Sequence, residues 1–491
     1  MVFQVSSLEQ DALTVLRLVR SIKNSFAPVN RVPPEVLSLI TDYYRKDGIA
    51  DRNLLALTQV CRRWRDIHIS RSLLWTRLDF KNIDKTLAYI QRSRSSALNL
   101  YLVEGEATDD AFALVIPHIR RLKSLTIKGT RLPSVLRHFS CHAPLLKKLD
   151  IKIRPGFGAV LVPTLFYGDL PSLHTLRIGG AITHFPWKNL ANLQVVELAR
   201  HSPNAYRITQ LLDFFESAPL LHTVELIHWQ PFSSDAPPER IVPLRCLKVL
   251  TATTGSRPSI LLHHLHIPAG ASLILRTNSG GECPLTNYLQ KSPRNFSNLS
   301  HITAINLLFD DVRTYLLLRG PSGSFSICYP WSEQAFPSLE PVLSTTRRLM
   351  ITYRDSPGPA ELEDCPIFRT LMSTNQLRTL VLIDCYDLVP FTRALDPGRD
   401  PSNLVLCPNI EELVLYVEDW SPSNVRHLIG MAKNRCFRGR KLSLIKFVDL
   451  DFCKSQYDVL SLREHVTDVY YCLGVTRPSW DHIPAGIDGG G

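Results

Sequence analysis

The sequence has little of what marks a secreted, membrane-spanning or disulfide-bonded protein. Its first 30 residues contain no apolar segment of the secretory kind, because charges interrupt them at Glu9, Asp11, Arg17, Arg20 and Lys23. No apolar run reaches the roughly 18 residues that a membrane span needs. The 11 cysteines are odd in number and include no Cys-x-x-Cys pair, which favours reduced thiols. We therefore expect a cytoplasmic or nuclear protein that does not engage a membrane.

The signatures of catalysis are also missing. No phosphate loop and no Gly-x-Ser-x-Gly elbow occur, and the pair Gly156 and Gly158 lacks the third glycine of a dinucleotide fingerprint. His263, His264 and His266 lie close together, but no carboxylate or cysteine accompanies them at metal-ligand spacing. We expect a non-catalytic protein with no metal site and no cofactor.

The formal net charge is +11, which can favour acidic partners, nucleic acid included. The lysines and arginines are spread along the chain without a block of like charge, so a solvated basic surface is the preferred interpretation. A basic, nucleic-acid-associated repeat protein stays open as an alternative.

Residues 8–26 are predicted to form a helix. Leu13, Leu16, Val19 and Ile22 recur at three-residue steps and lie along one side of it. We expect this helix to pack on its own chain, although a partner could also receive it.

Residues 29–78 are predicted to form a small helical domain. Pro33 and Pro34 open one helix, because proline at a first turn gives up only an unpaired amide. After a polar break, Asp51 is placed to cap the next helix, whose apolar residues follow a 3.6-residue period up to Ile67.

This stretch resembles the F-box family in four separated elements, which are Val32-Pro33-Pro34-Glu35-Val36-Leu37, Ile40, Val60-Cys61-Arg62-Arg63-Trp64 and Leu74-Trp75. Val32 and Val36 stand where the family has leucine and isoleucine, and the spacer 44–52 is somewhat long. The resemblance implies a surface that binds a Skp-type adaptor and, through it, a cullin. By resemblance that surface includes Pro33, Glu35, Val36, Leu37, Ile40, Val60, Cys61 and Trp64. Leu37 and Trp64 are expected to belong to the internal core.

From Leu78 onward a short phrase, Leu-x-x-Leu-x-Leu, recurs. Its copies begin at Leu122, Leu146, Leu173, Leu193, Leu221, Leu247, Ile302, Leu377, Ile410 and Leu442, with a degraded copy at Thr346. The first steps are close to the period of about 20–29 residues that is typical of leucine-rich repeats. Each phrase predicts a strand with alternating inward residues, and neighbouring units must stack to bury them.

The predicted fold is therefore α/β, with a small all-helical F-box followed by an irregular leucine-rich-repeat solenoid. The asparagine that usually follows the strand is mostly missing, which predicts less regular turns. A wider α/β globule with internal repetition is the alternative. The predicted divisions are an N-terminal helix (1–28), the F-box (29–78), the solenoid with loop insertions (79–475) and a disordered tail (476–491).

Outward strand positions should line the concave face of the solenoid and bind a protein substrate. The candidates are Lys128, Lys148, Lys152, Arg177, Met350, Val381, Ile383, Val414 and Tyr416. The basic early positions favour an acidic or phosphorylated segment, and the apolar late ones would grip side chains. The alternative is a plain soluble surface early and coverage by the tail late.

Taken together, these features predict a substrate receptor of a Skp-cullin-F-box ubiquitin ligase, active in ubiquitin-dependent degradation. A scaffold that works outside a ligase is the second interpretation, beside the nucleic-acid alternative.

Overall fold

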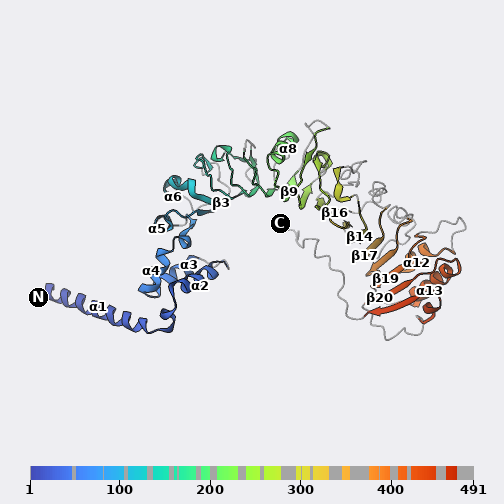
Figure 1. Cartoon of the computed structure of the whole chain (residues 1–491), viewed down its shortest axis with the longest axis horizontal. Helices are drawn as coiled ribbons and strands as arrows, with labels where there is room; N and C mark the ends of the chain where they lie inside the picture. Colours follow the sequence, from blue (N-terminus) through green and yellow to red (C-terminus); the bar gives the residue numbers. More distant parts are fainter. Residues whose placement is uncertain are drawn as a thin grey trace. The chain divides into compact units, whose positions relative to one another are not determined.

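A computed structural model gives the fold of the chain as two compact units, residues 1–193 and 194–491 (Figure 1). The described residues are 2–46, 51–80, 82–103, 109–129, 136–153, 160–162, 165–183, 189–199, 207–229, 239–254, 259–277, 295–299, 301–309, 313–330, 345–353, 375–385, 387–398, 407–416, 422–448 and 460–472.

The first unit begins with helices. They are α1 (Val2–Ser25), η1 (Pro28–Arg31), α2 (Pro34–Lys46), α3 (Asp51–Gln59), α4 (Arg62–Ser70) and η2 (Ser72–Trp75). Every side chain from Leu8 to Phe26 is exposed, so the expectation that this leading helix packs on its own chain was wrong. A helix gains most of its stability by burying an apolar face, and α1 leaves that face uncovered.

A parallel sheet follows in the first unit, with its strands paired in chain order. They are β1 (Arg77–Asp79), β2 (Leu98–Val103), β3 (Leu122–Gly129), β4 (Lys148–Ile153) and β6 (Thr175–Gly179). Between them lie α5 (Ile83–Ser93), α6 (Asp109–Val115), η3 (Ile116–Arg121) and η4 (Leu165–Gly168), while β5 (Val160–Val162) pairs with β7 (Ala181–Thr183). Burial alternates along β2, so every second residue enters the core.

Aromatic side chains link the core of this unit across successive segments between its strands. The ring of Phe112 lies 5.1 Å from that of Phe80 and 6.1 Å from that of Phe139, and Phe139 lies 5.8 Å from Phe166. All four are buried. Each of these successive segments therefore supplies a ring that packs against the ring of the next one.

The second unit contains the longer parallel array. One run of strands is β8 (Val195–Ala199), β9 (Thr223–Trp229), β11 (Val249–Thr254) and β13 (Ser272–Thr277), and the other is β17 (Arg348–Tyr353), β18 (Thr379–Ile383), β19 (Glu412–Tyr416), β20 (Leu444–Val448) and β21 (Asp468–Cys472). Smaller elements are α8 (Ile208–Glu216), α9 (Ser259–Leu262), α12 (Val389–Leu395), α13 (Pro422–Phe437), η7 (Ser297–Leu299), η12 (Leu460–Glu464), and the pair β10 (Val242–Pro243) and β12 (Leu265–His266). The chain is thus mixed α/β with a sheet dominated by parallel pairs.

An antiparallel insert interrupts the stacking in chain order. It consists of β14 (Ala304–Phe309), β15 (Arg313–Arg319) and β16 (Ser324–Pro330), in which β15 runs antiparallel to both neighbours. β16 pairs with β13 and β14 pairs with β17, both in parallel. The spatial order is therefore β13-β16-β15-β14-β17, which a simple one-strand-per-repeat array would not produce.

One backbone junction recurs at the start of many strands. The Lys147 carbonyl accepts from the amides of His174 and Thr175 at 2.8 and 3.0 Å. Pairs of consecutive amides bond in the same way to the carbonyls of Gln194, His222, Thr303, Arg347, Arg378 and Glu411. This repeated fork fixes each unit on the one before it, although the leucine phrases themselves are irregular.

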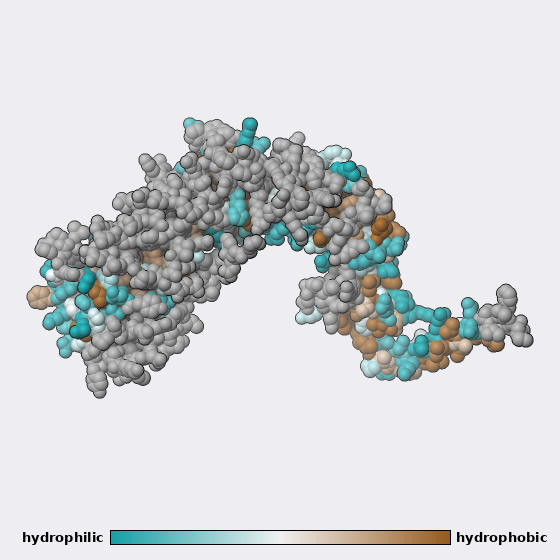
Figure 2. All heavy atoms as spheres, turned by 180° about the vertical axis from the view of Figure 1, so that it is seen from behind, coloured by the Kyte–Doolittle hydropathy of each residue, from teal (hydrophilic) through white to brown (hydrophobic). Residues whose placement is uncertain are grey.

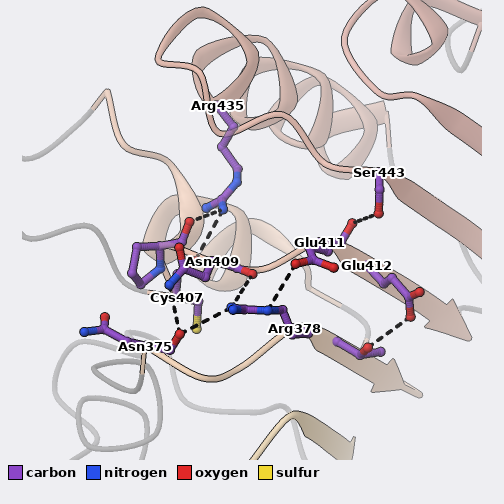
Figure 3. Close-up of polar contacts among 10 residues, drawn as sticks. Asn375, Arg378, Cys407, Asn409, Glu411, Glu412, Arg435 and Ser443 are labelled. Carbon is purple, nitrogen blue, oxygen red and sulfur yellow. Dashed lines mark hydrogen bonds and ion pairs between the residues drawn. The ribbon is translucent and has the colours of Figure 1, made fainter.

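Two arginines tie the turns of the second unit (Figure 3). Arg435 of α13 is fully buried and donates to the Leu395 carbonyl at 3.1 Å and to the carbonyls of Cys407 and Pro408 at 3.3 Å. Arg378 lies nearer the surface and donates to the Asn375 and Asn409 carbonyls at 3.3 and 3.2 Å. Asn409 Nδ2 also donates to the Asn375 carbonyl at 2.9 Å, so arginine and asparagine side chains both bond the carbonyls of these turns.

Several sequence predictions fall on the gaps between described segments. The predicted tail, 476–491, and most of the predicted insertions lie outside the described residues. Among the described helices, none is long and apolar enough to cross a membrane. The described residues also contain no group of three His, Cys, Asp or Glu side chains that could hold a metal ion.

Candidate functional site

An apolar face on the short helices near the N-terminus is the first candidate site. α2 starts at Pro34, and its exposed side includes Val36, Leu39, Ile40 and Tyr43, which are 40–69% exposed. Val60, in the turn before α4, is 55% exposed. Apolar side chains in such a group are a common mark of a protein-binding surface.

The eight residues predicted from the family resemblance divide into two groups. Pro33, Glu35, Val36, Ile40 and Val60 are exposed, and Cys61 is half-buried. Leu37 and Trp64 are buried in the core, as expected for these two. The exposed members could contact a partner directly, whereas Leu37 and Trp64 could only hold the helices in place.

A polar anchor that the sequence did not reveal joins the helices. The Asn30 Oδ1 atom accepts from Trp64 Nε1 at 2.9 Å and from Cys61 Sγ at 3.7 Å, while Asn30 Nδ2 donates to the Asn24 carbonyl at 2.7 Å. Asn30 is buried, so these bonds satisfy its amide. One side chain thus connects the end of α1 with the start of α4.

A second network holds α2 against α4. His68 lies 2.7 Å from Thr41 Oγ1 through Nε2 and 2.6 Å from the Trp64 carbonyl through Nδ1, and its ring stacks on Trp64 at 5.6 Å. Trp75 Nε1 donates to the His68 carbonyl at 2.9 Å. The exposed side of α2 is therefore supported by a buried layer with little freedom to move.

The comparison with protein families agrees with this architecture. The family model for F-box-like domains matches residues 29–81, which covers η1, α2, α3, α4, η2 and β1. The chain therefore carries an F-box-like domain at these residues. No curated protein matches it significantly.

The second candidate site lies on the sheet of the first unit. Side chains that alternate with the buried leucines form what we call the basic strip, defined by Lys128, Lys148, Lys152 and Arg177. Lys128 pairs in register with Lys152, and Ser124 with Lys148, so these residues lie on one side of adjacent strands. Lys128 and Lys152 are exposed, while Lys148 and Arg177 are half-buried.

An aromatic ring and a carboxylate modify the basic strip. Lys128 Nζ lies 5.5 Å from the ring centroid of Tyr101, and Arg77 lies 5.9 Å from the same ring. Asp150 is buried in register with Arg177, and its Oδ1 atom has no hydrogen-bond partner. The strip is thus positive, with one buried acid between Lys148 and Lys152.

The late positions predicted to grip a substrate behave differently. Met350, Val381 and Ile383 form a buried cluster with exposed fractions of 6%, 0% and 3%, and Val414 and Tyr416 pack against it half-buried. The first three are therefore not an open surface, and the prediction that they line one was wrong. Their strands read Leu-Met-Ile and Leu-Val-Leu-Ile, and such continuous apolar runs are typical of strands buried on both faces.

The predicted change from basic to apolar along the sheet also missed an acidic pair. Glu197 and Glu225 are aligned on the adjacent strands β8 and β9, and both are half-buried. Each glutamate stands at an outward position of a leucine phrase, one in the phrase that begins at Leu193 and the other in the phrase that begins at Leu221. The spacing of the phrases could therefore have identified this pair. The acidic pair belongs to the second unit, whereas the basic strip belongs to the first.

Proposed function

We propose that the chain is the substrate-recognition subunit of a Skp-cullin-F-box ubiquitin ligase and has no catalysis of its own. The observation that carries the proposal is the F-box-like match at 29–81 together with the exposed apolar side of α2 and Val60. The exposed face would dock a Skp-type adaptor, which in turn joins a cullin. The ligase subunits that transfer ubiquitin act in the cytoplasm or nucleus, where we place this protein.

Physical chemistry supports the docking role. An apolar helix face of this size gains free energy when a partner helix covers it, at roughly 25 cal/mol for each Å² of apolar surface removed from water. The bond between His68 and Thr41 joins α4 to α2, and Asn30 anchors Trp64 of α4, so little conformational entropy should be lost on binding.

The test is a pull-down with purified Skp-type adaptor. Wild-type protein should bind, and Val36→Asp/Ile40→Asp should lose binding because two carboxylates would be desolvated in the interface. Leu73→Asp/Leu87→Asp is a matched control, since both residues are exposed and lie outside the predicted face. If the first variant stays folded and still binds, the adaptor surface lies elsewhere.

We infer further that the sheet belongs to a divergent leucine-rich-repeat array and that the basic strip selects the substrate. The four cationic side chains of the strip, of which Lys128 lies beside Tyr101, favour an acidic or phosphorylated segment, because charged hydrogen bonds to carboxylate or phosphate are the stronger ones. The backbone fork that recurs between units supports the repeat interpretation.

The substrate proposal is tested by reversing the charge of three lysines, Lys128→Glu/Lys148→Glu/Lys152→Glu. Proteins captured by wild type should be lost by this variant while adaptor binding persists. Lys433→Glu/Arg438→Glu/Lys441→Glu, at exposed positions of the second unit, is the charge-matched control. Equal capture by both variants would remove the basic strip from the mechanism.

A further inference from the structure

Five residues of α1 recur at alternating steps of four and three, namely Leu8, Ala12, Val15, Val19 and Ile22, and we call them the α1 seam. This spacing places them on one side of the helix and is the pattern of a coiled-coil seam. The four larger members are 51–69% exposed, and apolar patches are visible along the helix in Figure 2. Such a stripe normally marks a surface that another helix covers.

The residues beside the seam differ between its middle and its ends. Leu16 and Leu18 flank the middle on opposite sides, and both are exposed. On the side of Leu16, Glu9 lies one heptad before it and Lys23 one heptad after it. The flanks are therefore apolar at the centre, acidic near one end and basic near the other.

We propose that the α1 seam pairs with the α1 seam of a second copy of this chain in antiparallel orientation. With the two-fold axis near Arg17, Val15 of one copy packs against Val19 of the second copy. Leu16 and Leu18 each lie next to their own counterparts across the axis, so the broad apolar centre is covered. Glu9 then lies beside Lys23 of the second copy at both ends, which gives two pairs of opposite charge.

A parallel pair fits the same residues less well. In that orientation Leu18 would lie beside Lys23 of the second copy, Leu16 beside Asp11, and Glu9 beside Gln4, because flanking positions pair five residues apart. Neither charge would be matched, and both leucines would face polar neighbours. Charge and apolar patterning therefore both favour the antiparallel arrangement.

The end of α1 is fixed to the F-box-like domain, which gives the pairing a structural consequence. Asn30 Nδ2 donates to the Asn24 carbonyl at 2.7 Å, and Asn30 is itself bonded to Trp64. Pairing through α1 would therefore bring two F-box-like domains into one assembly. The seam shares no residue with the predicted adaptor face, so the two contacts are independent.

The first test measures the mass of the full chain by light scattering between about 1 and 100 μM. Wild type should shift from monomer to dimer, and Val15→Asp/Val19→Asp should weaken self-association at least tenfold. Gln10→Asp/Thr14→Asp is the control, because it adds the same two charges with the same spacing on the opposite side of α1. The control should dimerise like wild type.

Three outcomes would overturn the proposal. They are a wild type that stays monomeric over this range, a Val15→Asp/Val19→Asp dimer as strong as wild type, and a control that is equally weakened. All these substitutions are at exposed positions, so thermal unfolding of each variant should match wild type at about 1 μM, where the proposal expects monomers. A monomer that nevertheless binds the adaptor through α1 would count against self-pairing and leave the adaptor proposal intact.

The orientation is tested by exchanging the flanking charges. Glu9→Lys and Lys23→Glu should each weaken the dimer, because each places like charges side by side, and the double exchange should restore it. Under mild oxidation Leu18→Cys should form a cross-linked dimer above the wild-type background, whereas Val15→Cys should not. A parallel pair would instead show little effect of the charge exchanges, with cross-linking of Val15→Cys and none of Leu18→Cys above background.

Discussion

Outward strand positions differ in environment between the two units. They reach solvent on the sheet of the first unit but are buried on β17 and β18 of the second, although both regions have similar leucine phrases. On β3, the positions that alternate with leucine are Ser124, Thr126 and Lys128, and all three reach solvent. On β18 the corresponding positions include Val381 and Ile383, and both are buried. The comparison shows that apolar residues at outward strand positions are better interpreted as buried core than as a surface for a binding partner. Continuous apolar runs favour burial of a strand on both faces.

A charge introduced at equivalent places should separate the two regions most strongly. Val381→Asp puts an unpaired carboxylate into a fully buried site, and we expect it to lower the free energy of unfolding by about 3–5 kcal/mol. Ser124→Asp, on the open face beside Lys148, should change it by about 1 kcal/mol or less. Urea unfolding followed by fluorescence measures both.

The contrast would fail if Val381→Asp were as mild as Ser124→Asp. In that case the cluster of Met350, Val381 and Ile383 would be accessible in solution, and the original prediction of an apolar binding surface would return.

The two arginines in Figure 3 sharpen the comparison within the second unit. Arg435→Met removes a buried guanidinium that bonds three carbonyls, and the carbonyls left without partners should lower stability by about 3 kcal/mol. Arg378→Met removes a half-exposed side chain that is paired with Glu411 at 3.1 Å, and the loss should be about 1 kcal/mol or less. Equal losses would show that burial does not decide the value of these contacts.

Much of this architecture could be predicted from the sequence, for reasons that particular residues make clear. The helices around Val36 and Trp64 have a strong apolar period, and the phrase at Leu122 alternates cleanly, so both follow from local pattern. The F-box-like assignment rested on separated motifs whose spacing a chance hairpin would not reproduce. The mixed α/β character followed from the same two signals.

The rest depended on contacts between residues far apart in the chain. Asn30 bonds Trp64 across 34 positions, and Arg435 bonds the Leu395 carbonyl across 40, so neither could be found from a local pattern. The antiparallel insert was missed because strand pairing is not encoded in the spacing of leucines. The burial of Val381 was missed because an outward apolar residue has the same sequence signal whether solvent or protein covers it.

The smallest predicted effect concerns two thiols of the second unit in alkaline solution. Burial, with the Asp384 carboxylate adding to it, raises the pKa of the Cys385 thiol well above its ordinary value. Burial also raises the pKa of Cys407 to about 12, although the Arg435 cation opposes the shift. In the unfolded chain both thiols ionise near their ordinary value of 9.0, so the unfolded state loses protons first.

Stability should therefore be unaffected by these groups below pH 9 and should fall as pH rises above it, since the folded chain holds protons that the unfolded chain has released. Between pH 8 and pH 10 we expect a loss of about 1 kcal/mol for each thiol. Urea midpoints at the two pH values measure the loss of stability. Cys385→Ala and Cys407→Ala should each remove about half of the pH-dependent loss that the two thiols cause together. Because each alanine also leaves a small cavity, the change between the two pH values, not the stability at either one, decides the result. If the Cys385→Ala/Cys407→Ala double variant loses as much stability between pH 8 and pH 10 as wild type does, the loss belongs to other titratable groups. The buried interior of the second unit would then be no more sensitive to alkali than the open face of the first.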